Sequence, residues 1–545
     1  MIFKNKMRYV LVLLLCLVLI FGCSAPSLSL QNMGRQAQIR VGLLQKQKII
    51  QFMVSGRFAI YGPDNRFIGR GMRGIRWQAR ALNFTPATIV YRLRYAENVS
   101  RSEAEKNSRS LKKLNLRSEI LPTKNKKPNF SSNEKRYDVL LWSTFPNAVE
   151  AATYRAELGK SFPLEIIEDE SVSAGGQIEI FSKESPKKYQ VPNGTRIHAE
   201  KFALLNMDVG NGFHFEGKAD NVFRGLLELR IDEKNQLSAV NIVDTEDYLR
   251  GVVPAEMPFG FPAAALEAQA IAARSEVLVK VERGAHQKEG FDICATVHCQ
   301  VYGGVSKEQP STDQAVKKTY GRVLKTGGRV IDAVYSAVCG GHTENNENVW
   351  LGTPQPYLRG RFDGRGAADL LRGRLQEHAT VKKWIDNKAP VFCNTLGADT
   401  PQPLLYTQKY FRWQASFTRY ELERSITKAT GKKMGVLRTI LPLERGVSGR
   451  IKRLQIIGSA GSFTIEKDLT IRRAMSDSTL YSSCFVVTPE LDEAGTPVRF
   501  NFRGAGWGHG VGMCQAGAAR LAQTGKTMVE ILGFYYQNTD VERVY

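Results

Sequence analysis

Residues 243–280 read VDTEDYLRGVVPAEMPFGFPAAALEAQAIAARSEVLVK, and this stretch decides how the chain is interpreted. It predicts the end of a strand, a turn that carries Glu256, and an alanine-rich helix. The helix is expected over residues 262–280, because they are strong helix formers without interior Gly or Pro. Apolar neighbours such as Met257 raise the pKa of a carboxyl group, so Glu256 is a candidate general acid. The alternative is a solvent-facing Glu in an ordinary turn.

One stripe of this helix carries charge among apolar residues. Glu267, Ala270, Ile271, Arg274 and Leu278 recur at helical spacing. The pattern predicts a packed ionic contact, and a surface salt bridge is the alternative.

The composition indicates a globular, multi-domain chain with an anionic partner. The chain has 545 residues, of which 43% are hydrophobic, and a net charge of +23. That length predicts two to four domains with real cores. A basic excess favours nucleic acid, anionic lipid or an acidic cell-wall polymer as the partner.

The N-terminus resembles an export signal. Lys4, Lys6 and Arg8 precede a short apolar run that ends before Cys23. Residues 1–22 are therefore expected to be a lipoprotein-type signal peptide, with Cys23 as the lipidated residue of a membrane-anchored protein facing the periplasm or cell wall. An ordinary signal peptide or an uncleaved anchor is the alternative. Export argues against nucleic acid as the partner and favours the wall and the membrane.

The rest of the chain predicts an α+β fold with a β-rich catalytic domain, packed helices and a smaller β-rich N-terminal region. Residues 23–100 are expected to be that β-rich module. Residues 101–136 hold eleven Lys/Arg against four Glu and suggest a basic linker. Residues 137–190 suggest a small α/β module whose element order resembles a wall-binding (SPOR-like) repeat. The catalytic domain is expected over 191–545.

Four segments in a fixed order resemble the stage II sporulation protein D / LytB amidase-enhancer family. They are DTEDYLRGVVPAEMP with the helix after it, DICATVHCQVYGG (292–304), AVYSAVCGGHTENNENVW (333–350) and GAGWGHGVGMCQAGAARLAQTGKTMVEILGFYY (504–536). The resemblance implies a lytic transglycosylase that acts on peptidoglycan glycan strands, preferably those without stem peptides, with Glu256 as the catalytic acid. One carboxylate is enough, because the MurNAc C6 hydroxyl supplies the nucleophile.

Two other functions stay open at this point. The first is a wall-binding protein that enhances a cell-wall amidase without catalysis of its own. The second is a hydrolase with two catalytic carboxylates, which is the usual arrangement in glycosidases.

The second of these segments also predicts a metal site. Cys294, His298 and Cys299 lie within six residues, and His286 lies eight residues upstream of Cys294. Cys and His are zinc ligands, and some relatives of the family bind zinc in this region. We predict a structural zinc here, although the expected reaction requires no cofactor. A disulfide or a buried cysteine pair is the alternative.

The remaining candidates are contacts to the glycan. Gln300 and Tyr302 are expected to line the substrate groove, and Trp507 offers a ring face to a sugar. Cys339 and Cys514 are a candidate disulfide pair. The full set of predicted substrate contacts is Gln269, Arg274, Gln300, Tyr302, His342, Trp507, His509 and Gln515.

Overall fold

The structure is a computed structural model. It describes residues 38–86, 88–123, 136–159, 163–172, 175–209, 217–365, 374–397 and 400–545. The predicted signal peptide and Cys23 lie outside the described residues. Within them, no helix is both long enough and apolar enough to cross a bilayer.

A large sheet forms from the first strands of the chain and from strands that follow about a hundred residues later. Its strands are β1 (Gln38–Gln47), β2 (Ile49–Ser55), β3 (Phe58–Tyr61), β4 (Phe67–Gly71), β5 (Trp77–Thr85), β10 (Gly175–Ser182), β11 (Ser185–Pro192), β12 (Thr195–Val209), β13 (Gly217–Ile231), β14 (Leu237–Asp244) and β15 (Ile293–Cys294). Within the described residues the order is β11-β10-β5-β2-β12-β13-β14-β1-β15, while β3 pairs with β12 and β4. The apolar residues of these strands alternate along each strand, and one face of the sheet is buried around Phe52, Trp77 and Phe223.

This sheet corrects the expected domain boundaries. The N-terminal strands 38–85 were expected to form a separate module, but β1 pairs with β14 and β2 pairs with β12. Strands β10 and β11, expected in the small α/β module, also belong to the large sheet. Alternation of apolar residues identifies strands but not their partners, so the sequence could not reveal this pairing.

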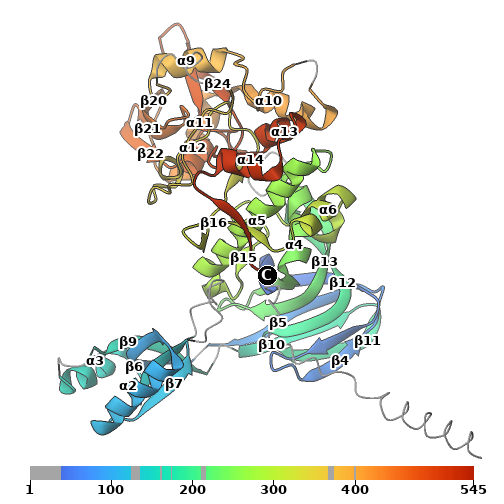
Figure 1. The fold of residues 1–545 in the computed structure, drawn as a ribbon, viewed down its shortest axis with the longest axis vertical. Coiled ribbons are helices and arrows are strands. Elements are labelled where there is room, and N and C mark those ends of the chain that lie inside the picture. The colour runs from blue at the N-terminus through green and yellow to red at the C-terminus, as the bar shows by residue number, and fades with distance from the viewer. Residues whose placement is uncertain are drawn as a thin grey trace, which may run out of the picture. The chain divides into compact units, whose positions relative to one another are not determined.

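A separate small unit is inserted between β5 and β10 (Figure 1). It contains β6 (Thr88–Val99), α2 (Arg101–Lys113), β7 (Ser118–Pro122), β8 (Tyr137–Phe145), α3 (Ala148–Glu157) and β9 (Glu165–Val172). Its antiparallel sheet has the order β7-β8-β6-β9, the ferredoxin-like βαββαβ arrangement. The helices bury Ala104, Leu111 and Ala151 on the sheet.

The expected basic linker over 101–136 is therefore wrong for its first part. Residues 101–113 form α2, which Ser100 caps by accepting the N–H of Glu103, and residues 118–122 form β7. The many Lys and Arg side chains of α2 lie on its solvent side. Only two buried apolar residues, one at each end of the helix, tie it to the sheet. The resemblance of this unit to a wall-binding repeat stays a prediction.

Two helices follow β14 and lead to the centre of the molecule. They are α4 (Thr245–Glu256) and α5 (Ala263–Arg283). Helix α5 is buried along most of its length. Ala270 and Val277 face the core beneath the large sheet, whereas Leu266 and Ala272 belong to a second core.

The second half of the chain packs around this second core and a third one. Its elements are η1 (Gln287–Glu289), η2 (Gly304–Lys307), α6 (Pro310–Lys318), β16 (Arg322–Thr326), β17 (Arg329–Val330), β18 (Tyr335–Ser336), α7 (Asn346–Trp350), α9 (His378–Asp386), η3 (Gln402–Thr407), α10 (Gln408–Phe411), β19 (Arg412–Thr418), α11 (Arg419–Thr430), β20 (Leu437–Arg445), β21 (Ile451–Gly458), β22 (Gly461–Glu466), α12 (Asp468–Ala474), β23 (Phe485–Leu491), β24 (Pro497–Ala505), β25 (Met513–Cys514), α13 (Gln515–Gln523), α14 (Met528–Tyr535) and β26 (Asp540–Arg543). In Figure 1 the red helices α13 and α14 lie next to the green α5, and all three share the second core. The predicted α+β class is confirmed.

An enclosed ion pair fixes α4 on α5. The guanidinium of Arg274 donates to both oxygens of Glu246, at 2.7 and 2.8 Å, and its side chain has no solvent exposure. The predicted ionic contact in the α5 stripe therefore exists, but its acidic partner comes from α4. Glu267, the acidic residue of the stripe, instead faces the largely exposed Lys318 at 3.4 Å.

These two ion pairs on one helix should differ strongly in their effect on stability. Arg274→Met should lower the free energy of unfolding by about 3–5 kcal/mol, because it leaves the Glu246 carboxylate buried without its partner. Glu267→Gln is the matched control and should cost only about 0–1 kcal/mol, since its pair is solvated. Urea denaturation followed by circular dichroism measures both. Equal losses in the two variants would contradict this account.

Candidate active site

Glu256 is the last residue of helix α4. The sequence predicted a turn at Glu256, and this prediction is wrong, because residues 245–256 form a helix. The first turn of this helix carries Glu246 and Asp247, where the helix dipole favours negative charge. The carboxylate of Glu256 accepts the backbone N–H of Val301 at 2.8 Å. The side chain thus lies between the end of α4 and the loop that follows β15.

The surroundings of Glu256 favour its protonated form. Burial raises the pKa of this carboxyl to about 7, although the N–H of Val301 acts in the opposite direction. The negative charge of Glu276 raises the pKa further, and the ammonium of Lys280 lowers it. The residue is not closed off, because part of its surface remains in contact with solvent. Glu256 can therefore hold a proton near neutral pH, and as a residue it is half-buried rather than enclosed.

A polar network lies beside this carboxyl group. Gln300 donates to Glu276 at 2.7 Å and accepts the Tyr248 hydroxyl at 3.0 Å. Its amide also lies 3.3 Å from the Tyr335 hydroxyl. Lys280 forms an ion pair with Glu276 at 2.7 Å. Both oxygens of Glu276 are consequently engaged, one by Lys280 and one by Gln300.

The four predicted metal ligands meet at one point. Their ligand atoms all lie within 4.8 Å of one another. The Nε2 atom of His286 is 3.2 Å from Nδ1 of His298. The Nδ1 atom of His298 is in turn 3.6 Å from the sulfur of Cys294 and 3.5 Å from the sulfur of Cys299. A tetrahedron with Zn–N near 2.0–2.1 Å and Zn–S near 2.3 Å requires roughly 3.3 Å between nitrogens and roughly 3.5 Å between nitrogen and sulfur. The donor set and its spacing fit zinc.

The fold holds these ligands close to Glu256. Helix α5 ends at Arg283, and Gly284 follows with a φ of +63°, a left-handed conformation that stops the helix before His286. Cys294 lies in β15, which pairs in parallel with β1 at the edge of the large sheet. Cys299 comes two residues before Val301, the residue that donates to Glu256. An ion at this point would therefore also fix the loop that carries this N–H group.

Five of the predicted substrate contacts are buried, namely Gln269, Arg274, Gln300, Tyr302 and Gln515, and the expected groove position of Gln300 is therefore not what the structure shows. Arg274 and Tyr302 are enclosed by protein partners. Arg274 is enclosed by its pair with Glu246, so a glycan cannot reach it. Tyr302 donates to Asn241 at 3.1 Å and packs on Tyr248, with ring centroids 4.7 Å apart. We therefore assign both side chains a structural role. They lie on the same motifs as Glu256, which is why sequence proximity suggested a role in binding.

A buried pair of amide side chains links the helix after the first of the four family segments with the fourth segment, residues 504–536. Gln515, at the start of α13, donates to Gln269 of α5 at 3.2 Å, and both side chains are buried. This contact joins two helices that are 246 positions apart in the sequence. Neither amide is offered to a ligand in this conformation.

The other three candidates are half-buried. His342 contacts the carbonyl oxygen of Thr343 through Nδ1 at 2.7 Å, and burial lowers its pKa. His509 lies 5.0 Å from the ring of Trp350, and burial lowers its pKa to about 4. Trp507 stacks on Tyr410, with ring centroids 4.1 Å apart. One face of Trp507 is thus covered by protein.

Several residues of the site were missed by sequence reasoning. Glu276 and Lys280 are spaced i, i+4 on α5, a signal that was available but is common on helices. Tyr335 lies in the third motif, where nothing marks it as different from other apolar residues. Phe259 and Trp350 keep 58% and 45% of their surface exposed and are aromatic faces that a sugar ring could cover.

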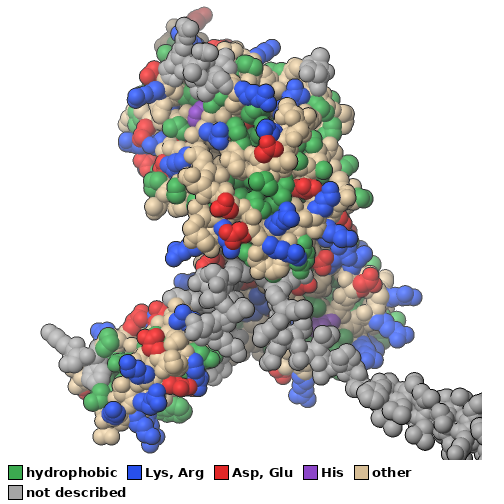
Figure 2. Space-filling model, viewed as in Figure 1, with side chains coloured by type: hydrophobic (Ala, Val, Ile, Leu, Met, Phe, Trp, Pro, Cys, Tyr) green, Lys and Arg blue, Asp and Glu red, His purple; other side chains and the backbone are tan. Residues whose placement is uncertain are grey.

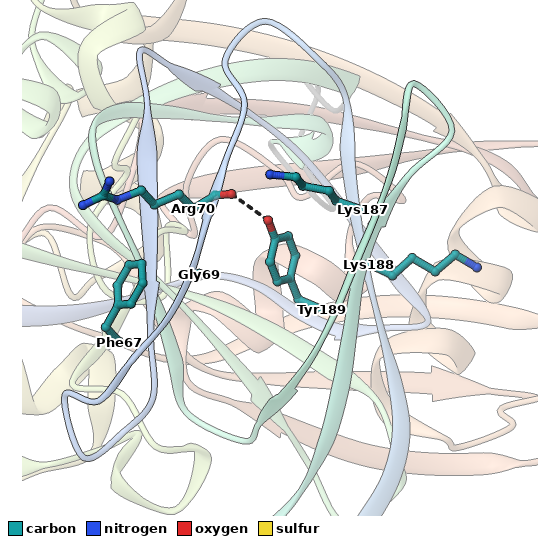
Figure 3. A pocket seen from close by; sticks show the side chains of 6 residues that line it. All are labelled: Phe67, Gly69, Arg70, Lys187, Lys188 and Tyr189. Carbon is teal, nitrogen blue, oxygen red and sulfur yellow. Dashed lines mark hydrogen bonds between the residues drawn. The ribbon is translucent and has the colours of Figure 1, made fainter.

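A pocket on the large sheet is separate from this site. It has a volume of about 590 Å³ and is lined by side chains of β4 and β11 together with their neighbours (Figure 3). The Tyr189 hydroxyl donates to the carbonyl of Arg70 at 2.6 Å in its wall. None of its lining residues belongs to the Glu256 network, and Figure 2 shows Lys and Arg side chains spread over the visible face among Asp and Glu.

Comparison with known proteins agrees with this geometry. Residues 233–325, which include Glu256 and the four Cys and His ligands, match the family model described as stage II sporulation protein. Residues 344–512 match a model described as a domain of unknown function (DUF8618).

Relatives cover more than half of the chain. An uncharacterized protein of Brachyspira hyodysenteriae is 31% identical over 315 residues, which is 57% of this chain and 70% of the relative. The amidase enhancer of Bacillus subtilis is 30% identical over 53% of this chain and 40% of its own length. Stage II sporulation protein D of Bacillus subtilis is 26% identical over 65% of this chain and 89% of the relative.

The fold and the site thus define an α+β protein built around one carboxyl group at a helix end. The chain belongs to the stage II sporulation protein D / LytB amidase-enhancer family.

The raised pKa of Glu256 should make the free energy of unfolding depend on pH. Between pH 4.5 and 7 the folded protein binds a proton at Glu256 that the unfolded chain has lost, so its stability falls as the pH rises through this range. Glu256→Gln removes this effect, so the variant should gain stability relative to wild type from pH 5 to pH 8. Thermal unfolding midpoints at both pH values measure the gain. If the midpoints of Glu256→Gln and wild type differ by the same amount at pH 5 and at pH 8, the raised pKa is contradicted.

Proposed function

We propose that the protein is a lytic transglycosylase that cleaves the MurNAc–GlcNAc bonds of peptidoglycan, preferably in glycan strands without stem peptides. The observation that carries the proposal is the Glu256 carboxyl, which has a pKa raised to about 7 and one N–H donor, Val301. Membership of the family supports the substrate class.

In the proposed reaction Glu256 acts first as an acid and then as a base. Its carboxyl proton passes to the glycosidic oxygen as the bond from this oxygen to the MurNAc C1 breaks. The carboxylate then accepts the proton of the MurNAc C6 hydroxyl, whose oxygen bonds to C1 and closes a 1,6-anhydro ring. A pKa near the working pH suits both transfers.

The contacts of the Glu276 carboxylate support a reaction that uses a single carboxylate, Glu256. A two-carboxylate hydrolase needs a second group that is free to activate water or attack the sugar. Glu276 is the neighbouring carboxylate on α5, and its oxygens are already engaged by Lys280 and Gln300. Its proposed role is to position Gln300.

The second candidate is a protein that enhances a cell-wall amidase. It is favoured by the name of the Bacillus subtilis relative, amidase enhancer, which matches 53% of this chain. In this case binding to the wall matters, and the charge of Glu256 does not.

We also propose that the protein is exported and held at a membrane by lipid on Cys23. The basic and apolar pattern of residues 1–22 supports this, and the net charge of +23 suits an anionic wall or membrane surface.

The proposed zinc has a structural role. His286, Cys294, His298 and Cys299 would supply all four ligands, which leaves no open position for a substrate. Its contribution is to hold the loop that carries Gln300 and the N–H of Val301 against Glu256.

Replacing Glu256 tests the catalytic proposal. Purified protein should release 1,6-anhydro ends from stem-peptide-free glycan, and Glu256→Gln should reduce the rate by about 10²–10⁴-fold because the proton donor is lost. The wild-type rate should fall as the pH rises above 7. Mass spectrometry of the products measures both. Glu267→Gln, the same change on the outer side of α5, should keep the wild-type rate.

Two other outcomes would select another function. Incorporation of ¹⁸O from water at the new reducing ends identifies a hydrolase. Amidase stimulation that is equal in wild type and Glu256→Gln, without anhydro products, identifies the enhancer.

Metal removal tests the structural zinc. A chelator or Cys299→Ser should increase hydrogen exchange in residues 284–302 and lower the cleavage rate, while strands β2, β5, β12 and β13 stay protected. Cys484→Ser, a buried cysteine outside the site, is the control and should leave this loop unchanged. Unchanged exchange after complete metal removal would rule out the proposed role.

A further inference from the structure

A second group of metal-binding side chains lies far from Glu256 in the sequence and was not predicted. The ligand atoms of Cys339, Asp363, Cys393 and Cys514 all lie within 4.8 Å of one another. The sulfur of Cys339 is 3.5 Å from that of Cys393 and 3.2 Å from Oδ2 of Asp363. A zinc tetrahedron with Zn–S near 2.3 Å and Zn–O near 2.0 Å requires roughly 3.8 Å between sulfurs and roughly 3.5 Å between sulfur and oxygen.

The four residues come from separate segments and are all enclosed. Cys339 follows β18, Cys514 ends β25, and Asp363 and Cys393 lie in loops before and after α9. Each is at most 2% exposed. A buried carboxylate among three thiols is unfavourable without a cation. Within the described part of the chain, no salt bridge joins Asp363 to a basic side chain.

The groups around the cluster orient its atoms as expected beside a metal. The Tyr535 hydroxyl donates to Oδ1 of Asp363 at 2.7 Å, so Oδ2 is left to face the sulfurs. The N–H of Cys393 also donates to Oδ2, at 3.1 Å, and the N–H of Cys339 donates to the sulfur of Cys514 at 3.2 Å. Such outer contacts fix the direction of metal ligands.

Positive charge is also close by. Arg450 donates to the carbonyl of Cys339 at 3.2 Å, and Arg412 donates to the carbonyl of Gly340 at 3.0 Å. Three thiolates and one carboxylate around a divalent ion carry a net charge of −2. The buried guanidinium of Arg450 and the half-buried guanidinium of Arg412 offset this charge.

We propose that Cys339, Asp363, Cys393 and Cys514 bind a second structural zinc ion, which joins the third and fourth motifs to the loops on both sides of α9. Sulfur-rich ligation selects zinc over magnesium or calcium. Four protein ligands in a closed interior leave no place for a substrate. The ligand atoms surround a single ion and are too close together to enclose a polynuclear cluster.

A disulfide is the competing arrangement, and one between Cys339 and Cys514 was expected from the sequence. The three thiols are free cysteines in the structure. Any disulfide would use two of them and leave the third beside the buried Asp363. A metal ion uses all three thiols and neutralises the carboxylate, which favours it.

The metal content of the purified full-length chain tests the proposal. The His286→Ala/His298→Ala variant is expected to lack the site near Glu256, so any zinc that it retains reports on the second site. Inductively coupled plasma mass spectrometry should find about one zinc ion per chain in this variant. Adding Asp363→Asn or Cys393→Ser should lower the content toward zero. Adding Cys484→Ser, a buried cysteine outside the cluster, should leave one zinc.

A spectroscopic measurement keeps the test valid if an added substitution prevents folding. Cobalt loaded into the His286→Ala/His298→Ala variant should give strong thiolate charge-transfer absorption. The proposal is overturned if this variant binds neither zinc nor cobalt through thiolate, or if Asp363→Asn and Cys393→Ser both retain its zinc. A disulfide among the three cysteines in a non-reducing peptide map overturns it as well. None of these outcomes depends on cleavage of peptidoglycan.

Discussion

The bidentate ion pair between Arg274 and Glu246 is the contact on which the site depends. It is enclosed between α4 and α5, and so it fixes the direction in which α4 ends. The last residue of α4 is Glu256, and its position relative to α5 determines which charges it meets. Glu276 and Lys280, both on α5, act on the pKa of Glu256, so a change in the packing of the two helices would change this pKa.

The second support of the site comes from the opposite side. The N–H of Val301 donates to Glu256 from the loop after β15, and β15 pairs with the large sheet. The ligand atoms of four Cys and His side chains lie close together beside this loop. One carboxyl group is thus held by a helix end and by a loop with different origins in the chain. This arrangement explains how a single acidic residue can have a defined proton affinity.

The sequence predicted those parts of the site that are local. Glu256 was suggested by its apolar neighbours and by the family resemblance, and the four ligands from His286 to Cys299 were suggested by their close spacing. Arg274 was assigned to the substrate because its partner comes from another helix. Cys339 and Cys514 were paired as a candidate disulfide, but Asp363 and Cys393, which lie in loops on both sides of α9, were not expected beside them. The small α/β module was expected only over 137–190, and its first half was instead divided between the N-terminal module and the basic linker, because the charge of α2 hides its few buried residues.

The pairing of β5 with β10 gives the inserted unit an unusual independence. Thr85 and Gly175, which flank the insertion, are direct partners in the large sheet. The sheet would therefore close as a simple hairpin without the 88–172 unit. Evolution can exchange, lose or enlarge such a unit without disturbing the register of any neighbouring strand. A chain without this unit would keep the same strand pairing around β14, the strand that leads into the helix carrying Glu256.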